Sequence, residues 1–455
     1  MVDQIIEYIR NNKQRFIDEL IEFLKIPSLS AQSRHKADCE RAADFVRKQF
    51  SQLGLDAQLH PTAGNPIVTA RHTSPENKTT VLIYGHYDVQ PPEPLDLWTS
   101  PPFEPRIEGD NIIARGATDD KGQLFTHIKA VEAHLKTNAR LPVNLIFVIE
   151  GEEEVAGVHV SEFIRTHRDD LKCDVAVVSD SSQYAPNMPA LCYGLRGICA
   201  QEIRVQGPKQ DLHSGSFGGA VANPVNVLCQ MIAQLKDESG KIRIPGFYDD
   251  VLPLEQWERE AFAALPWDDE AFRQSLGVKA LHGEETYTSI ERKWARPTLD
   301  VNGIFGGYNG EGAKTIIPAW GGAKITMRLV PNQNPQTISR LFRDFIRKIT
   351  PPTVEVSFID HSSCGPVIVK RSAPFVAEAL ESLRRGFGAE PVFIREGGSI
   401  PIVLTIQQEL NVHALLLGFG LPDDNAHGPN EKLSLTDFER GIRTSATFFH
   451  LCAQK

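Results

Sequence analysis

The chain has 455 residues, and its 58 acidic side chains outnumber its 48 basic ones, which gives a formal net charge of -10. Hydrophobic residues make up 41% and charged residues 23%, the proportions of a folded globular protein rather than a disordered one. The acidic balance argues against nucleic-acid binding, and the lack of an apolar run of about 20 residues argues against a membrane span.

The seven cysteines are scattered and include no CxxC pair, which argues against a disulfide framework and a structural zinc knot. The first residues, Met-Val-Asp-Gln-Ile-Ile-Glu, do not combine a basic stretch with a following apolar stretch, so no signal peptide is predicted. We therefore expect a cytoplasmic protein.

The first part of the chain alternates between helical and strand patterns. Apolar spacing from Ile5 to Leu24 predicts a helix that stops before Pro27. Buried strands are predicted at 81–84, 143–149, 175–178 and 414–417, and helices at 124–135 and 160–171. This alternation predicts an α/β domain with a mostly parallel central sheet and helices on both faces, and in such sheets sites form at the carboxyl ends of the strands.

The middle of the chain has a different pattern. A half-buried strand is predicted at 198–205, helices at 224–235 and 338–349, and alternating strands at 324–329 and 354–359. This is an α+β pattern with one solvated sheet face. The length also favours two domains. We therefore predict a first domain in two parts, 1–196 and 370–455, with a second domain, 197–369, inserted between them.

Acidic residues and histidines follow the predicted strands of the first domain. They occur in Gly85-His86-Tyr87-Asp88, in Asp119-Asp120, in Glu152-Glu153-Glu154, in Ser179-Asp180 and in the segment from Asp423 to Glu431. Each group alone is more often a solvated face or a helix cap than a site. Together they place several carboxylates at one sheet edge, where mutual repulsion favours bound divalent cations. Imidazole with carboxylate ligands suits Zn²⁺, with Mn²⁺ or Co²⁺ as alternatives.

These segments resemble the di-zinc metallopeptidase family of carnosinases and cytosolic nonspecific dipeptidases, which is related to aminoacylases and succinyl-diaminopimelate desuccinylase. The similarity runs through nearly the whole chain. It is strongest in six stretches: 85–90 (GHYDVQ), 114–122 (ARGATDDKG), 211–215 (DLHSG), 328–332 (RLVPN), 395–401 (REGGSIP) and 426–433 (AHGPNEKL).

The resemblance implies two divalent metal ions, most simply Zn²⁺, and a role for each residue of the strand ends. One ion would be bound by His86 and Asp180, the other by Glu154 and His427, and Asp119 would bridge both. Asp88 would stand behind His86 and fix its tautomer. Glu153 would be the general base, since a base must lie near the metals without being bound by them. The peptide bond Asp119–Asp120 is expected to be cis.

The resemblance also implies substrate contacts in the inserted domain. His213 would come from the partner subunit of a homodimer and hold the oxyanion, so the inserted domain would serve as both lid and dimerisation surface. Arg328 would bind the C-terminal carboxylate of the substrate, as a planar guanidinium does well, together with the Gly398–Ser399 turn. Asn302 and His361 are further candidate contacts.

The predicted function is therefore metal-dependent hydrolysis of dipeptides or short peptides. An N-acyl-amino-acid deacylase or desuccinylase on the same two-metal site is the alternative. A non-catalytic metal-binding scaffold is a third possibility, which the complete set of ligands and base argues against.

Overall fold

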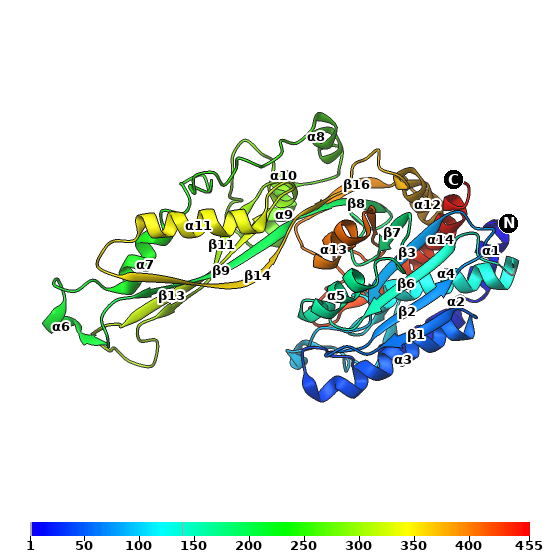
Figure 1. Cartoon of the computed structure of the whole chain (residues 1–455), viewed down its shortest axis with the longest axis horizontal. Coiled ribbons are helices and arrows are strands. Elements are labelled where there is room, and N and C mark those ends of the chain that lie inside the picture. Colours follow the sequence, from blue (N-terminus) through cyan, green and yellow to red (C-terminus); the bar gives the residue numbers. More distant parts are fainter. Residues whose placement is uncertain (1, 139) are drawn as a thin grey trace. The chain divides into compact units, whose positions relative to one another are not determined.

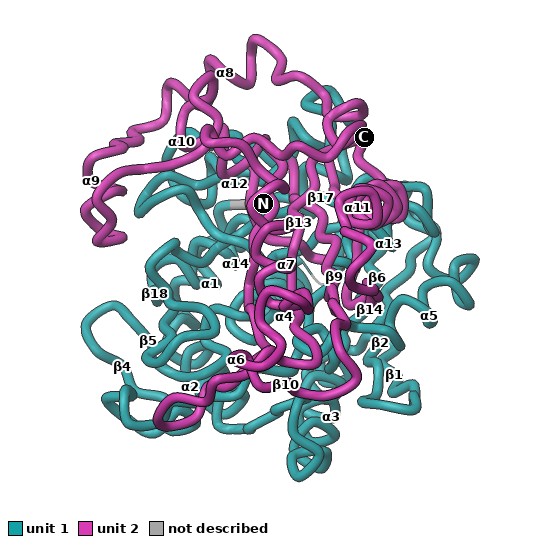
Figure 2. The backbone as a smooth tube through the Cα atoms, turned by 90° about the vertical axis from the view of Figure 1, so that its left-hand side faces the viewer, with its two compact units in different colours: residues 1–193, 369–394, 401–455 teal, residues 194–368, 395–400 magenta. Residues whose placement is uncertain are grey.

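The computed structural model describes residues 2–138 and 140–455, which divide into two compact units (Figure 2). The α/β unit comprises Met1–Tyr193, Val369–Ile394 and Pro401–Lys455, and the inserted unit comprises Gly194–Ile368 and Arg395–Ile400. The inserted unit thus begins at residue 194 and ends at 368, where the sequence predicts 197 and 369. The return of residues 395–400 to the inserted unit has no counterpart in the sequence prediction.

A twisted sheet forms the centre of the α/β unit, in the order β1-β2-β6-β3-β7-β17-β8 (Figure 1). In chain order these strands are β1 (Asp56–His60), β2 (Ile67–His72), β3 (Thr80–His86), β6 (Asn144–Glu150), β7 (Val175–Val178), β8 (Ala190–Leu195) and β17 (Ala414–Leu417). The four central strands, β6, β3, β7 and β17, run parallel. The pairs β1–β2, β2–β6 and β17–β8 are antiparallel, so the predicted parallel arrangement describes the centre of the sheet and not its flanks.

Helices cover both faces of this sheet. The larger layer comprises α1 (Val2–Asn11), α2 (Lys13–Leu24), α3 (Lys36–Gln52), α4 (Lys121–Asn138), α12 (Val376–Phe387) and α14 (Leu435–Cys452), and the smaller layer comprises α5 (Val158–Thr166) and α13 (Pro401–Leu410). Alternate strand residues, such as Val81 and Ile83, point into the main hydrophobic core with the larger layer. Their neighbours Leu82 and Tyr84 are also buried, which explains the continuous apolar runs in the sequence.

Two short strands outside the central sheet matter for the site. Strand β18 (Lys432–Ser434) pairs with β5 (Asn111–Ile113), which in turn pairs with β4 (Arg106–Glu108). This ladder fixes the chain after residue 431 beside the chain before residue 114, although more than 300 residues separate them in the sequence. The loops that precede β18 and follow β5 are therefore neighbours.

The inserted unit is built on a four-stranded antiparallel sheet in the order β11-β13-β9-β14. The strands are β9 (Gly197–Gln206), β11 (Thr298–Gly306), β13 (Trp320–Leu329) and β14 (Glu355–Cys364). Helices α7 (Pro224–Ile232) and α11 (Pro335–Ile349) pack on one face and bury Ile203, Ile325 and Phe342 with them. Along β13, exposed or half-buried residues alternate with buried ones from Lys324 to Leu329, as the sequence predicts for a sheet with one solvated face.

The remaining elements of the inserted unit are short. They are β10 (Leu212–His213), β12 (Ile316–Ile317), β15 (Val367–Ile368), α6 (Ser214–Phe217), α8 (Gln256–Ala263), α9 (Asp269–Ser275) and α10 (Ser289–Ala295). Strand β16 (Val392–Glu396) pairs with β8 and leads into the 395–400 segment. Over the described residues, no helix is both long and apolar enough to cross a bilayer.

Some predicted elements differ in extent. The first predicted helix is two helices, α1 and α2, with Asn12 between them. Helix α5 ends at Thr166 rather than 171, because the chain turns at His167, which leaves the helical region of backbone angles. The strands at 81–84, 175–178 and 414–417 agree with β3, β7 and β17 to within two residues.

Candidate metal centre

The ends of the central parallel strands carry the predicted ligands to one edge of the sheet. His86 is the last residue of β3, and Asp180 follows β7 by two residues. Glu154 lies in a single 3-10 turn (Glu153–Val155) after β6, and Asp119 lies in the loop that opens α4. His427 lies in the loop between β17 and β18, with a positive φ of 62° that a histidine rarely adopts.

Two groups of ligand atoms form there, and they share Asp119. One group is His86, Asp119 and Asp180, and the other is Asp119, Glu154 and His427; within each, the ligand atoms all lie within 4.8 Å of one another. The Nε2 atom of His86 lies 3.1 Å from Oδ1 of Asp119, and the Nε2 atom of His427 lies 2.9 Å from Oδ2 of the same carboxylate. The two oxygens of Asp119 thus face two different histidines.

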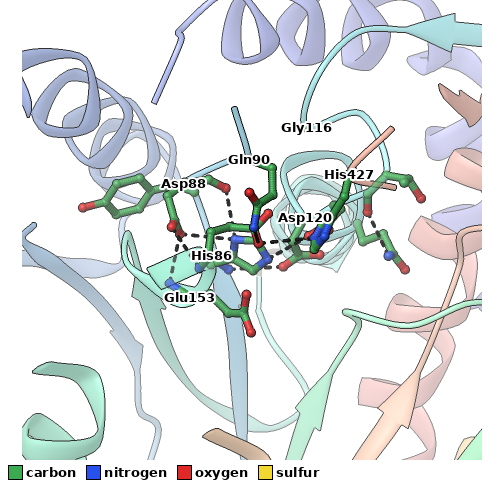
Figure 3. Close-up of polar contacts among 12 residues, drawn as sticks. His86, Asp88, Gln90, Gly116, Asp120, Glu153 and His427 are labelled. Atoms are coloured by element: carbon green, nitrogen blue, oxygen red, sulfur yellow. Dashed lines mark hydrogen bonds and ion pairs between the residues drawn. The ribbon is translucent and has the colours of Figure 1, made fainter. Parts of the chain in front are cut away.

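Asp88 stands behind His86, where the resemblance places it. The Nδ1 atom of His86 lies 3.1 Å from the carbonyl oxygen of Asp88 and 3.3 Å from its Oδ1 (Figure 3). Both residues are fully buried. The Asp88 carboxylate also accepts hydrogen bonds from the backbone N–H groups of Glu153 and Glu154, at 3.3 Å and 3.2 Å. Asp88 therefore ties the histidine on β3 to the acidic turn that follows β6.

The three glutamates of the acidic turn have three different environments. Glu152 contacts a different partner, with its Oε2 lying 2.5 Å from Nδ1 of His159. Glu154 belongs to the second ligand group, and its Oε2 accepts a hydrogen bond of 2.8 Å from Gln90. Glu153 lies between them and belongs to neither ligand group. Burial and the nearby Asp180 raise the pKa of Glu153 to about 9.

The electrostatics of the site fit bound cations. Burial alone would lower the pKa of His86, but hydrogen bonding to Asp119 and Asp88 raises it well above its usual value. Hydrogen bonds to Asp119 and Glu154 raise the pKa of His427 to about 10. Among the described residues, Oε1 of Glu154 is buried without a hydrogen-bond partner. Crowded carboxylates that favour positive charge in the site, two imidazoles beside them and an unsatisfied buried oxygen are the properties expected of a divalent-cation site.

The bond between Asp119 and Asp120 is cis, as the resemblance predicts. Asp120 is buried, and its Oδ2 accepts a hydrogen bond of 3.2 Å from the backbone N–H of His86. Helix α4 begins immediately afterwards. A Cβ at Gly122 would lie 1.9 Å from the carbonyl oxygen of Ala117, so only glycine permits this tight entry into the helix.

The predicted substrate contacts of the inserted unit fall in separate places. Arg328 on β13 donates a hydrogen bond of 3.1 Å from Nη1 to Oγ of Ser399, so these two are brought together, with Gly398 next to Ser399. His361 on β14 lies 3.3 Å from the Oε2 of Glu202 and is 43% exposed. Asn302 occupies an irregularity in the pairing of β11 with β13.

His213 ends the short strand β10 and caps α6. Its Nδ1 accepts a hydrogen bond of 3.0 Å from the backbone N–H of Gly215. The side chain is exposed, and its other ring nitrogen is not used in this cap. The capping contact orients the imidazole within the inserted unit.

Three residues that contact the ligands or their loops have no role in the sequence prediction. They are Gln90, which binds Glu154, and the buried pair Arg115 and Glu431. All three lie inside the stretches that carry the family resemblance. A buried charged pair cannot be distinguished from a surface pair by its letters alone, so the sequence gives no direct sign of their positions.

Known proteins match this chain over nearly its full length. The family model described as "Peptidase family M20/M25/M40" matches residues 82–450. The Cys-Gly metallodipeptidase of Schizosaccharomyces pombe is 35% identical over 99% of this chain and 98% of its own, and the human Beta-Ala-His dipeptidase is 31% identical over 100% and 93%. The structure of an M20 family metallo-carboxypeptidase from Sulfolobus solfataricus superposes with a TM-score of 0.87, at 33% identity, over 97% of this chain and 99% of that one.

These matches confirm the family that the motifs indicate. Membership implies a hydrolase that uses divalent metal, and the two ligand groups around Asp119 supply a place for it. The chain belongs to peptidase family M20/M25/M40.

Proposed function

We propose that the chain is a metal-dependent dipeptidase. The observation that carries the proposal is the pair of ligand groups sharing Asp119, because a shared carboxylate is how a protein holds two cations a few ångströms apart. The relatives support the substrate class, since both the Cys-Gly metallodipeptidase and the Beta-Ala-His dipeptidase are named for dipeptides. Neither name favours the N-acyl-amino-acid alternative.

Two divalent cations are proposed, with Zn²⁺ favoured over Mn²⁺ and Co²⁺ because two histidines accompany the carboxylates. His86 and Asp180 would hold one cation, Glu154 and His427 the other, and Asp119 both. Cations bound there supply Lewis acidity, which polarises the scissile carbonyl and makes a nearby water acidic at neutral pH.

Glu153 is the proposed general base. It adjoins the ligand Glu154 yet belongs to neither ligand group, and the bond from its N–H to Asp88 fixes the backbone of the turn. It would take a proton from the attacking water and then give it to the leaving amine. Burial and the charge of Asp180 raise the pKa of Glu153, and two cations would oppose this shift and so favour its basic form.

Arg328 and Ser399 are the proposed binding site for the free carboxylate of the dipeptide. The Nη1–Oγ hydrogen bond between them aligns a cation and a hydroxyl. Ser399 is a neutral partner, so this hydrogen bond does not neutralise the charge of Arg328, which a substrate carboxylate would do. Gly398, His361 and Asn302 are proposed as further substrate contacts.

The proposed active form is a cytoplasmic homodimer. The inserted unit is proposed as lid and dimerisation domain, with His213 of one subunit serving the metal centre of the other, since the imidazole is exposed and held in place by its cap. A cytoplasmic location is supported by the buried thiols of Cys39 and Cys452, a use of cysteine typical of reducing compartments.

A substrate panel tests this function. Free dipeptides, among them Cys-Gly and β-Ala-His, are compared with N-acetyl- and N-succinyl-amino acids, with Zn²⁺ or Mn²⁺ supplied and with a chelator as control. The proposal predicts chelator-sensitive cleavage of free dipeptides. Cleavage of the acylated compounds alone would assign the chain to the deacylase alternative, and dipeptide cleavage that survives complete metal removal would contradict the metal mechanism.

A further inference from the structure

Behind the ligands lies a buried ion pair between Arg115 and Glu431, 2.9 Å from Nη1 to Oε2. The exposed fractions of the two side chains are 1% and 0%. We propose that Arg115 and Glu431 are positioning residues that hold the loops of Asp119 and His427 in the geometry that binds metal. The proposal rests on the proposed metal centre and adds residues that do not themselves bind the cations.

Glu431 organises the loop that carries Asp119. Its Oε1 accepts hydrogen bonds from the backbone N–H groups of Thr118 at 2.9 Å and Asp119 at 3.0 Å. Its Oε2 accepts from the backbone N–H of Gly116 at 2.8 Å and from Arg115. Four donors therefore surround one carboxylate, and three of them belong to the backbone that leads into the shared ligand.

Arg115 also contacts the backbone of two loops other than its own. Its Nη2 lies 3.2 Å from the carbonyl oxygen of His427 and 3.4 Å from that of Pro91. The first contact reaches the loop of the second histidine ligand. The second reaches the segment that continues from His86, Asp88 and Gln90. One guanidinium thus joins three loops of the α/β unit, each carrying a ligand or a residue that contacts one.

A further contact supports this arrangement. The backbone N–H of Ala114 donates a hydrogen bond of 3.0 Å to the carbonyl oxygen of Glu431, continuing the β5–β18 ladder toward the site. His427 and Asn430 both have positive φ angles, 62° and 59°, in the loop that this contact closes. A loop with such backbone angles needs external contacts to persist, and Arg115 supplies one at His427 itself.

The chemistry of the four donors requires a carboxylate rather than an amide. Glutamine has the same shape, but its amide nitrogen donates and does not accept. In the Glu431→Gln variant, the amide NH₂ group would replace one of the two carboxylate oxygens. Whichever oxygen it replaces, its two hydrogens would face N–H donors of the loop or of Arg115. The variant would also leave the Arg115 charge buried without its partner, which is strongly unfavourable. The loop would therefore shift, and Asp119 with it.

Metal affinity measured by chelator competition tests the proposal, with Zn²⁺ as the probe. Glu431→Gln and Arg115→Lys should each weaken binding by about 10- to 100-fold, the usual effect of removing a residue that orients a metal ligand. At saturating Zn²⁺, kcat for a dipeptide should fall while KM stays near its native value, because the substrate contacts of the inserted unit are intact.

Glu132→Gln provides the matched control. Glu132 is also a buried carboxylate of the α/β unit, with an ion pair to Lys129 at 3.1 Å and a hydrogen bond from Tyr8 at 3.0 Å, but it contacts no ligand loop. The Glu132→Gln variant should have a lower unfolding temperature and an unchanged Zn²⁺ affinity. If Glu431→Gln does not fold, Arg115→Lys gives the same comparison with the charge retained.

Native Zn²⁺ affinity in Arg115→Lys, or in a folded Glu431→Gln, would overturn the positioning role. An equal loss of affinity in Glu132→Gln would overturn it as well, since general destabilisation would then explain the effect. These outcomes are separate from the proposed function, because native protein that cleaves no dipeptide can still show the difference in metal affinity.

Discussion

The α/β unit and the inserted unit differ in the contacts that hold their candidate histidines. In the α/β unit, His86 and Asp88 are fully buried. Asp88 contacts His86 and also accepts hydrogen bonds from the backbone of the Glu153–Glu154 turn. In the inserted unit, His213 is exposed and accepts a hydrogen bond from the backbone of Gly215, and His361 is 43% exposed and lies 3.3 Å from Glu202.

This difference matches two kinds of task. Metal ligands must hold a fixed geometry before the cation arrives, so neighbouring groups orient them whether they are buried, as His86 is, or exposed, as His427 is. Residues that bind substrate must be accessible to it. The comparison predicts that changes in the α/β unit abolish metal binding or chemistry, whereas changes in the inserted unit weaken substrate use with the metal still bound.

The largest effect should come from Asp119→Ala. Asp119 is common to both ligand groups, so its loss should empty the centre and reduce kcat/KM on the order of 10⁴-fold. Metal analysis of the purified variant and dipeptide assays measure both. If the Asp119→Ala variant keeps its full metal content, Asp119 is not a ligand shared by the two groups of metal-binding residues.

Glu153→Gln should separate chemistry from metal binding. The variant should retain metal while kcat falls by about 10²–10⁴-fold, the usual contribution of a general base. Glu152→Gln is the control in the same turn, because Glu152 is engaged with His159 and should be dispensable for the chemistry. Comparable turnover in both variants would show that Glu153 is not the base.

Arg328→Met should raise KM for free dipeptides by about 10- to 100-fold, equivalent to about 1.5–3 kcal/mol for hydrogen bonds to a charged group. Metal content should not change. Lys324→Met, an exposed lysine on the same strand, is the control for loss of positive charge. The difference in KM between Arg328→Met and Lys324→Met should be smaller for dipeptide amides, because these lack the carboxylate. If Arg328→Met and the native protein have equal KM values for free dipeptides, Arg328 does not bind the carboxylate.

His213→Ala should lose activity and keep its metal. Mixed in equal amounts with inactive Glu153→Ala under conditions of subunit exchange, it should restore about a quarter of the sites, since half of the dimers are mixed and each has one complete site. Proven exchange without recovered activity would mean that His213 does not act across a dimer.

The sequence predicts the centre of the fold better than its borders. Strands β3, β7 and β17 are buried on both faces, so their sequences are continuous apolar runs and their positions can be predicted from the sequence. The antiparallel strands β1 and β2 flank them, and β1 is partly exposed, so it carries no comparable signal. Residues 395–400 join the inserted unit through tertiary contacts, such as the buried Arg395–Glu258 ion pair, which no local pattern reveals.

For the site, the sequence predicts the chemical groups and the structure supplies their connections. His86, Asp119, Asp180, Glu154 and His427 are recognisable because they follow strands or lie in family motifs, and they do gather in space. The different roles of the three consecutive glutamates are visible only in the structure, where Glu152 contacts His159, seven residues away in the sequence. The Arg115–Glu431 pair depends on contact across 316 residues and could not be predicted from either segment alone.

Crystals of the native protein grown with Zn²⁺, and anomalous diffraction collected at the zinc edge, would test the central claim most directly. The account predicts two peaks per chain, both against Asp119, one beside His86 and Asp180 and the other beside Glu154 and His427. A single peak, or zinc bound away from Asp119, would contradict the two-metal centre.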